Sequence, residues 1–86
     1  MTTDVLFVCV HNAGRSQMAK EIFNSIAKQR KLPYYADSAG TQPSTSVHAN
    51  VAIVLREVGI EISDSKPQFI TNDMVEEAQK IVTMGC

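Results

Sequence analysis

Residues 5–10 form the feature that most restricts the fold, an unbroken apolar run that reads Val-Leu-Phe-Val-Cys-Val. No polar residue marks a solvent-facing side, and this is the pattern of a strand buried on both faces. Strands of this kind belong to mostly parallel sheets that helices cover from both sides. The run therefore predicts an α/β fold.

Helical and strand-like patterns alternate along the rest of the chain. The expected elements are, in chain order, a helix over 15–31, a strand over 34–39, a helix over 48–58, a short helix over 73–79 and a strand over 80–84. Gly40 closes the second strand and Gly59 stops the second helix. Asp73, followed by Glu76 three residues later, resembles a capping box for the short helix.

Apolar side chains recur at helical spacing in both long helices. The expected buried faces are Met18, Ile22 and Ile26 with Ala19, Phe23 and Ala27 in the first helix, and Val51, Val54, Leu55 and Val58 in the second. Strands that alternate with helices predict one three-layer domain over residues 1–86, with helices on both faces of the sheet. Ligands of such sheets bind at the carboxyl ends of the strands, where Cys9 and residues 84–86 are expected to lie.

Charge and cysteine content narrow the class of protein. The formal net charge is −1, which argues against a nucleic-acid binder because such proteins need a basic face. No basic region precedes the first apolar run and no segment is long enough to cross a membrane, so a cytoplasmic protein is expected. In that compartment the two cysteines, Cys9 and Cys86, are expected to be reduced and chemically active rather than joined in a structural disulfide.

A candidate oxyanion site lies between the first strand and the first helix. Its residues are Cys9, Val10, His11, Asn12, Ala13, Gly14, Arg15 and Ser16. The amides of the loop over 10–14 can all point toward one centre. The free amides at the start of the helix can point there too. The Arg15 guanidinium matches two oxygens of a phosphate-like anion. The same groups lower the pKa of a nearby thiol, which makes Cys9 a candidate nucleophile with Ser16 as a hydrogen-bond donor.

The two histidines are expected to have modest roles. His11 lies in the loop, where its backbone amide is a better candidate for anion binding than its ring is for a general base. With two histidines and no cluster of carboxylates, no metal site is expected.

The stretch CVHNAGRSQMA resembles the active-site signature of the low-molecular-weight tyrosine phosphatase superfamily, and most closely its thioredoxin-coupled arsenate reductase branch. The resemblance continues through 37–41 (DSAGT), 54–63 (VLREVGIEIS), Lys66-Pro67 and the final VTMGC, and so covers essentially all 86 residues. It implies a sheet with strand order 2-1-3. It also implies phosphate-like or arsenate anions as ligands, an external thiol such as thioredoxin as reductant, and no bound cofactor.

The resemblance implies a role for each matching residue. The Cys9 thiolate attacks arsenic, while Arg15 and the loop amides stabilise the oxygens. Asn12 matches the asparagine that shapes the loop, and Ser16 matches the hydroxyl that steadies the thiolate. Cys86 matches a second redox thiol, which attacks the Cys9 sulfur, releases arsenite and leaves a Cys9–Cys86 disulfide.

The sequence also departs from the family pattern. Family members continue past the third strand with a loop that carries an acidic aspartate, a fourth strand and a final helix, so the domain is expected to be truncated after the third strand. Asp64 and Asp73 do not match the position of that acid, and no general acid is assigned. Its loss is expected to lower activity by roughly 10²–10⁴-fold. The third strand is then an exposed edge, open to a second copy or to a partner chain.

Two other functions remain open from the residues alone. A phosphatase acting on aryl phosphates such as phosphotyrosine needs Cys9 and Arg15 but not Cys86. A non-catalytic module would bind the oxyanion without forming an adduct on Cys9. Dependence of turnover on Cys86 separates the reductase from the phosphatase, and adduct formation separates both enzymes from the module.

Overall fold

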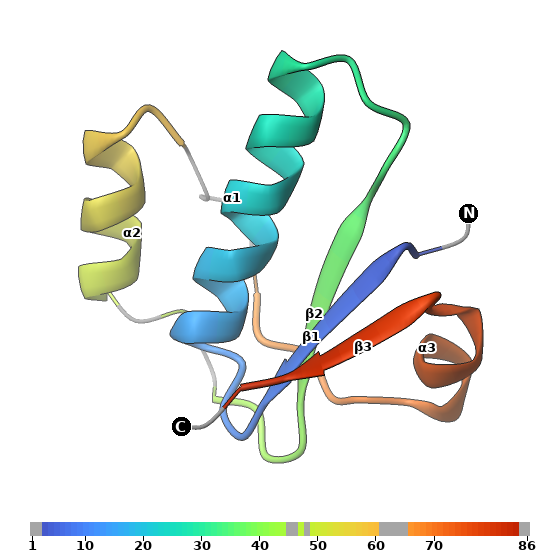
Figure 1. The fold of residues 1–86 in the computed structure, drawn as a ribbon. Coiled ribbons are helices and arrows are strands. Elements are labelled where there is room, and N and C mark those ends of the chain that lie inside the picture. Colours follow the sequence, from blue (N-terminus) through green and yellow to red (C-terminus); the bar gives the residue numbers. More distant parts are fainter. Residues whose placement is uncertain (1–2, 45–46, 48, 61–65, 85–86) are drawn as a thin grey trace.

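The structure is a computed structural model that describes residues 3–44, 47, 49–60 and 66–84. Its helices and strands alternate as the sequence predicts (Figure 1). They are β1 (Val5–Cys9), α1 (Arg15–Gln29), β2 (Ala36–Gly40), α2 (Ala49–Glu57), α3 (Asn72–Glu77) and β3 (Lys80–Thr83).

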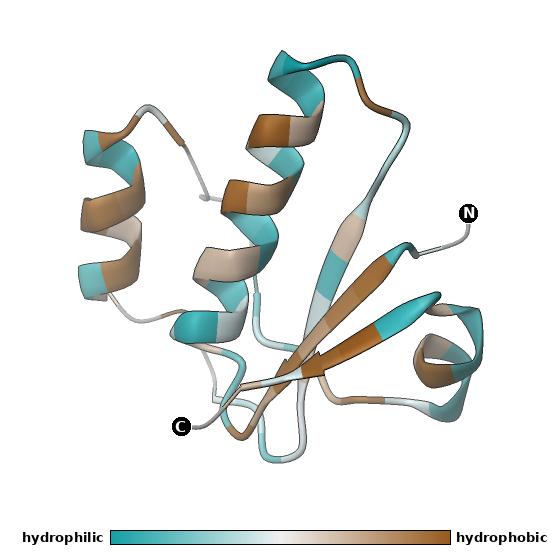
Figure 2. Cartoon of the chain, viewed as in Figure 1, coloured by the Kyte–Doolittle hydropathy of each residue, from teal (hydrophilic) through white to brown (hydrophobic). Residues whose placement is uncertain are grey.

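The strands form one parallel sheet in the order β2-β1-β3, which confirms the expected 2-1-3 order. Cys9, the last residue of β1, pairs with Gly40, and Val8 pairs with Thr83 on the other side. Because all three strands point the same way, their carboxyl ends meet at one edge of the sheet. The central strand β1 and the edge strand β3 both carry strongly apolar residues (Figure 2).

Helices cover both faces of β1, as predicted for a three-layer fold. On one face Leu6, Val8 and Ala39 form a buried cluster with Met74 and Ala78 from the α3 region. On the other face the ring of Phe7 meets that of Phe23 in α1, edge to face, with centroids 6.4 Å apart. The alternation of side chains along a strand explains this division, because residues 6 and 8 point away from residues 7 and 9.

The second helix packs on α1 rather than on the sheet. Val51 and Leu55 are buried there, with Met18 and Ile60 against them. The helix ends in a Schellman motif at Gly59, whose φ is 86°. The Ile60 amide donates to the Leu55 carbonyl and the Gly59 amide to the Arg56 carbonyl. Gly59 therefore stops the helix as predicted.

Part of each predicted apolar face is not buried. In α2, Val54 and Val58 are exposed because only the side that carries Val51 and Leu55 meets α1. In α1 the prediction was wrong for Ile22 and Ile26, which are exposed. Those two side chains lie on the side of α1 away from the sheet, whereas Phe23 and Ala27 face it.

The cap of α3 differs from the prediction. Thr71, not Asp73, is the N-cap: its backbone is extended, and its hydroxyl accepts from the Met74 amide at 3.2 Å. Asp73 lies inside the first turn, where its backbone is helical and cannot take the extended angles of a cap. A carboxylate there still interacts favourably with the helix dipole.

The second strand begins and ends later than predicted, at Ala36 and Gly40. Its start is fixed from α1, where the Asn24 side chain donates to the Ala36 carbonyl and accepts from the Ala36 amide. Gly40 is the last residue of β2, but hydrogen bonding continues there, because its amide donates to the Gln68 carbonyl and its carbonyl accepts from the Ile70 amide. The segment 66–70 thus continues the sheet beyond β2 through a parallel bridge between Gly40 and Phe69.

Candidate active site

Cys9 lies where β1 ends and the loop to α1 begins. Its side chain is 5% exposed. On one side, the backbone of Cys9 pairs with Gly40 of β2. On the other side, the Met84 amide donates to the carbonyl of Val8, the residue before Cys9, at 2.8 Å. The backbone that carries the sulfur is therefore held from both sides.

The loop that follows Cys9 is held by its carbonyl groups. The carbonyls of Cys9, Val10 and His11 accept from the amides of Thr41, Gln42 and Ser44, at 3.2, 2.8 and 3.0 Å. In a trans peptide the next amide points opposite to the carbonyl, and no peptide bond among the described residues is cis. The amides of residues 10, 11 and 12 therefore point away from the 41–44 segment.

The amide of Asn12 reaches the sulfur. It donates to Cys9 Sγ at 3.1 Å, and the backbone of Asn12 takes a left-handed angle, φ 51°, to do so. Asparagine tolerates this region better than most residues because its short side chain can bond locally. Asn12 therefore brings one backbone amide of the 10–14 loop to the sulfur.

A second hydrogen bond to the sulfur comes through Ser16. The Asn12 side chain donates from Nδ2 to Ser16 Oγ at 2.8 Å, and Ser16 Oγ lies 2.8 Å from Cys9 Sγ. An amide nitrogen can only donate, so the serine oxygen accepts there and its own hydrogen is free for the sulfur. Cys9 thus accepts from two buried donors, an arrangement that favours the thiolate over the thiol.

Asn12 is held in turn by two donors on its Oδ1. Gln17 donates from Nε2 at 3.1 Å and the backbone amide of Gln68 at 2.9 Å. Asn12, Ser16 and Gln17 are all fully buried. Buried polar groups of this kind need partners to offset their lost hydration, and here they supply them to one another.

Gly40 allows the loop to lie this close to β2. A Cβ on Gly40 would be 2.6 Å from the Val10 carbonyl oxygen and 3.0 Å from the Asn12 Cβ. Any side chain would therefore displace the loop that carries the sulfur-binding amide. The residue predicted as a strand end is needed for this close approach.

The other predicted site residues have varied positions. Arg15 is the first residue of α1 and its side chain is exposed, as is that of His11, whose Nδ1 lies 3.2 Å from the Gln42 carbonyl oxygen. Ala13 is fully buried and Gly14 is the N-cap residue, without a side-chain cap. Cys86, His48 and Asp64 lie outside the described residues.

Sequence reasoning missed Gln17, Gln68 and the importance of Gly40. One signal was available for Gln17, because helical spacing places it on the sheet-facing side of the predicted helix, beside Asn24 seven residues later. Polar residues on a buried face indicate a hydrogen-bonded network. Gln68 gave no comparable signal, since it lies in a segment without periodicity.

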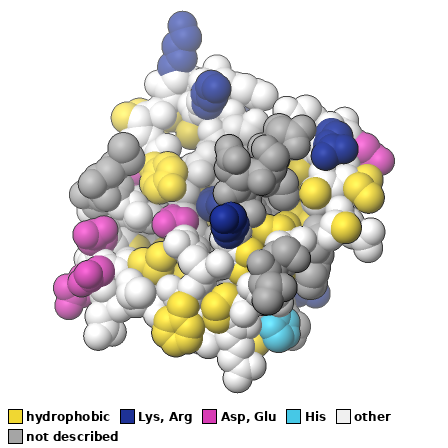
Figure 3. Space-filling view, turned by 180° about the vertical axis from the view of Figure 1, so that it is seen from behind, with side chains coloured by type: hydrophobic (Ala, Val, Ile, Leu, Met, Phe, Trp, Pro, Cys, Tyr) yellow, Lys and Arg dark blue, Asp and Glu magenta, His cyan; other side chains and the backbone are white. Residues whose placement is uncertain are grey.

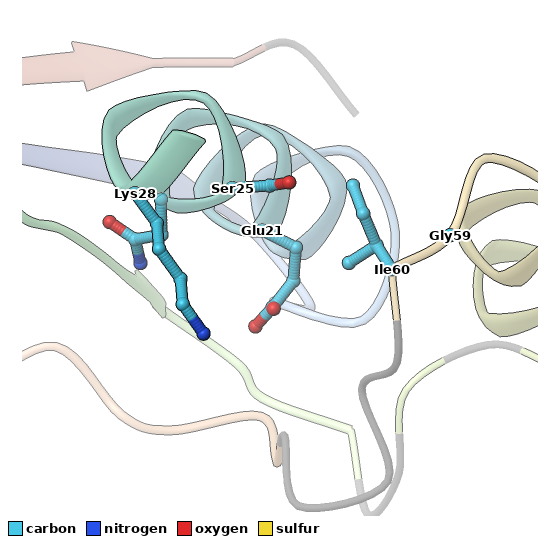
Figure 4. Close-up of a pocket in the computed structure, with 6 residues that line it drawn as sticks. Glu21, Ser25, Lys28, Gly59 and Ile60 are labelled. Atoms are coloured by element: carbon cyan, nitrogen blue, oxygen red, sulfur yellow. The ribbon is translucent and has the colours of Figure 1, made fainter. Parts of the chain in front are cut away.

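A separate hollow of about 270 Å³ lies between α1 and the end of α2. Its lining is Glu21, Asn24, Ser25, Lys28, Gly59 and Ile60 (Figure 4). This lining has no nucleophilic thiol and a single carboxylate, so it does not compete with Cys9 as a catalytic site. Within the described ranges, no three histidine, cysteine or acidic side chains gather where they could hold a metal ion. The helices described there are also too short or too polar to cross a bilayer.

Comparison with known proteins identifies the family. Residues 4–86 match the family described as low molecular weight phosphotyrosine protein phosphatase. The chain belongs to this family. A putative arsenate reductase from Halobacterium salinarum is 37% identical over 99% of the chain, and the match covers 61% of that relative. The chain thus spans about three fifths of this relative's length.

Solved structures of the low molecular weight phosphatase family have the same fold. The thioredoxin-dependent arsenate reductase of Corynebacterium glutamicum superposes with a TM-score of 0.87 and 39% identity, over 99% of this chain and 43% of that one. A low molecular weight protein tyrosine phosphatase from T. tengcongensis gives 0.89 and 32%, over 96% and 58%. The family therefore includes members named for each of the two activities expected from the sequence.

Proposed function

We propose that this chain reduces arsenate to arsenite through a covalent adduct on Cys9. The observation that carries the proposal is the pair of donors on Cys9 Sγ, the Asn12 amide at 3.1 Å and Ser16 Oγ at 2.8 Å. Similarity to proteins named arsenate reductase selects arsenate as the oxyanion. The reaction runs in the cytoplasm, where thiol reductants are available, and needs no bound cofactor.

The first step forms the adduct. The Cys9 thiolate attacks arsenic, a sulfur–arsenic bond forms, and one arsenic–hydroxyl bond breaks as that hydroxyl takes a proton from solvent and leaves as water. Arsenic stays in the +5 state. The amides of residues 10–14 and the guanidinium of Arg15 bind the remaining oxygens at the start of α1, where the helix dipole favours an anion.

The second step moves the electrons. The Cys86 thiolate attacks Cys9 Sγ, a disulfide forms, and the sulfur–arsenic bond breaks with its electron pair passing to arsenic. Arsenic is reduced from +5 to +3 and leaves as arsenite. A dithiol reductant of the thioredoxin class then reduces the Cys9–Cys86 disulfide.

The position of Met84 supports Cys86 as the second thiol. Met84 is bonded to Val8, the residue before Cys9. Cys86 follows Met84 by two residues, and two residues span at most about 7 Å. A disulfide joins Cα atoms that lie about 4.4–6.8 Å apart, so a connection of two residues is long enough for the proposed Cys9–Cys86 bond.

Cys86→Ser is expected to leave adduct formation intact and to abolish repeated turnover with thioredoxin. The physical reason is that Cys9 keeps its donors while the arsenic–sulfur bond loses the thiol that breaks it. Mass spectrometry of the Cys9 peptide and arsenite release over several turnovers measure the two effects. Unchanged multiple turnover in Cys86→Ser would rule out the intramolecular relay.

Phosphoester hydrolysis is the second candidate, favoured by the family match and by the likeness to the T. tengcongensis tyrosine phosphatase. It uses Cys9 and Arg15 alone. Release of nitrophenol from an aryl phosphate that is lost in Cys9→Ser but unchanged in Cys86→Ser would support it. Anion binding without any adduct on Cys9 would instead support a non-catalytic module.

The edge of β3 is the proposed surface for a partner chain or for a second copy. All four of its residues are exposed, and Ile81 and Val82 are 44% and 40% exposed. Together with Ile22 and Ile26 of α1 they leave apolar side chains on the surface. The opposite side of the molecule, seen in Figure 3, also has hydrophobic side chains scattered among charged ones. Exposed apolar edges of this kind pair with further strands. The mass of the protein in solution tests for the second copy.

A further inference from the structure

Gln17 is a fully buried side chain to which neither the sequence nor the family comparison assigns a role. It is the third residue of α1. Both hydrogens of its Nε2 are used, one on Asn12 Oδ1 and one on the Lys66 carbonyl, each at 3.1 Å. Gln17 therefore joins the loop that carries the sulfur-binding amide to the segment 66–70.

The orientation of the Gln17 amide is determined by these partners. Asn12 Oδ1 and the Lys66 carbonyl can only accept, so the nitrogen of Gln17 must face them. Its Oε1 is left buried, without a hydrogen-bond partner in the described part of the chain. An unpaired buried carbonyl is unfavourable. Its presence indicates that the two hydrogen bonds donated by Nε2 contribute more free energy than the missing bond to Oε1 costs.

This orientation fixes the direction of the bonds that reach the sulfur. Because Gln17 and Gln68 both donate to Asn12 Oδ1, the Asn12 nitrogen must face Ser16. Ser16 then accepts from Asn12 and donates to Cys9. A reversed Asn12 amide would accept the hydroxyl hydrogen of Ser16 and take it away from the sulfur. Hydrogen bonds in such a chain also strengthen one another.

We propose that Gln17 is a positioning residue of the Cys9 site: its two donated hydrogen bonds fix the Asn12 amide, direct the Ser16 hydroxyl to the sulfur and tie thiolate formation to the segment 66–70. The inference rests on the proposed function, in which Cys9 reacts as a thiolate. It adds that the segment which extends the sheet past Gly40 also controls the nucleophile.

The test measures the pH midpoint of Cys9 alkylation by iodoacetamide. All variants carry Cys86→Ser, so that Cys9 alone reports. Gln17→Met keeps the length of the side chain but removes both donors, and its midpoint is expected to rise by roughly 0.5–1 pH unit. Gln29→Met, at an exposed position of the same helix, is the matched control and should leave the midpoint unchanged.

A double-mutant cycle separates positioning from general stability. Ser16→Ala removes the hydroxyl through which Gln17 is proposed to act, so Gln17→Met should add almost nothing to the midpoint in that background. Equal rises in the two backgrounds would overturn the proposal, as would no rise in the Ser16-containing protein. If Gln17→Met does not fold, Gln17→Glu places acceptors against Asn12 and Lys66, and the same rise is expected.

The parent protein distinguishes failure of the proposed function from failure of the positioning role of Gln17. If its Cys9 alkylates with the midpoint of an ordinary thiol, near pH 8.5, the proposed function fails. If the parent midpoint is low and the Gln17 variants share it, only the positioning role fails.

Discussion

Cys9→Ser is expected to abolish arsenate reduction, with a loss of roughly 10⁴-fold or more, as when other enzymes lose their nucleophile. The serine hydroxyl is a far weaker nucleophile at neutral pH, although the donors at 3.1 and 2.8 Å remain in place around it. Arsenite formed in a single turnover measures the effect without any reductant cycle.

Two controls define the result for Cys9→Ser. Mass spectrometry should still detect the arsenate adduct in Cys86→Ser but not in Cys9→Ser, which shows that loss of a thiol as such does not prevent the first step. Phosphate binding by Cys9→Ser should persist, because the amides and Arg15 are unchanged. Arsenite formation by Cys9→Ser at the parent rate would contradict the assignment of the nucleophile.

Gly40→Ala is expected to lower the rate of adduct formation by roughly 10²-fold, the effect of a small misplacement of reacting groups. The new Cβ would lie 2.6 Å from the Val10 carbonyl oxygen, a backbone atom that cannot turn aside. The loop must move, and the Asn12 amide moves with it. Overpacking of this kind also costs about 1–3 kcal/mol of stability, which urea denaturation measures.

Gly59→Ala is the matched control for Gly40→Ala. Its φ of 86° makes alanine unfavourable there by about 1–2 kcal/mol, yet a Cβ at Gly59 meets no atom within 4 Å. It should therefore lose stability while its adduct rate is unchanged. Equal effects of the two variants on adduct formation would mean that Gly40 acts through stability alone.

The sequence predicted the elements well because their signals are local. The apolar run before Cys9 gave β1, and the glycine at 59 ended α2 as expected. The predictions for Ile22 and Ile26 were wrong because periodicity reports which side chains share a face, and tertiary contacts decide which faces are covered. The cap of α3 was misplaced by two residues because threonine and aspartate are both good caps.

The candidate site was predictable only in part. Cys9, Asn12 and Ser16 lie within eight residues, so one motif contains them. The groups that hold this motif come from elsewhere: the Gln68 amide is 56 residues from Asn12, and Gly40 is 31 residues from Cys9 along the chain. Contacts of that kind depend on how β2 and the segment 66–70 meet, which no local pattern encodes.

The most direct test of the account is the alkylation of Cys9 against pH, with and without arsenate. Two buried donors and the start of α1 are expected to place the midpoint well below the value of about 8.5 for a free cysteine, and arsenate should slow alkylation by occupying the loop. A midpoint near that of a free thiol, together with an alkylation rate that arsenate does not change, would contradict the assignment of Cys9 as a thiolate nucleophile in an oxyanion site.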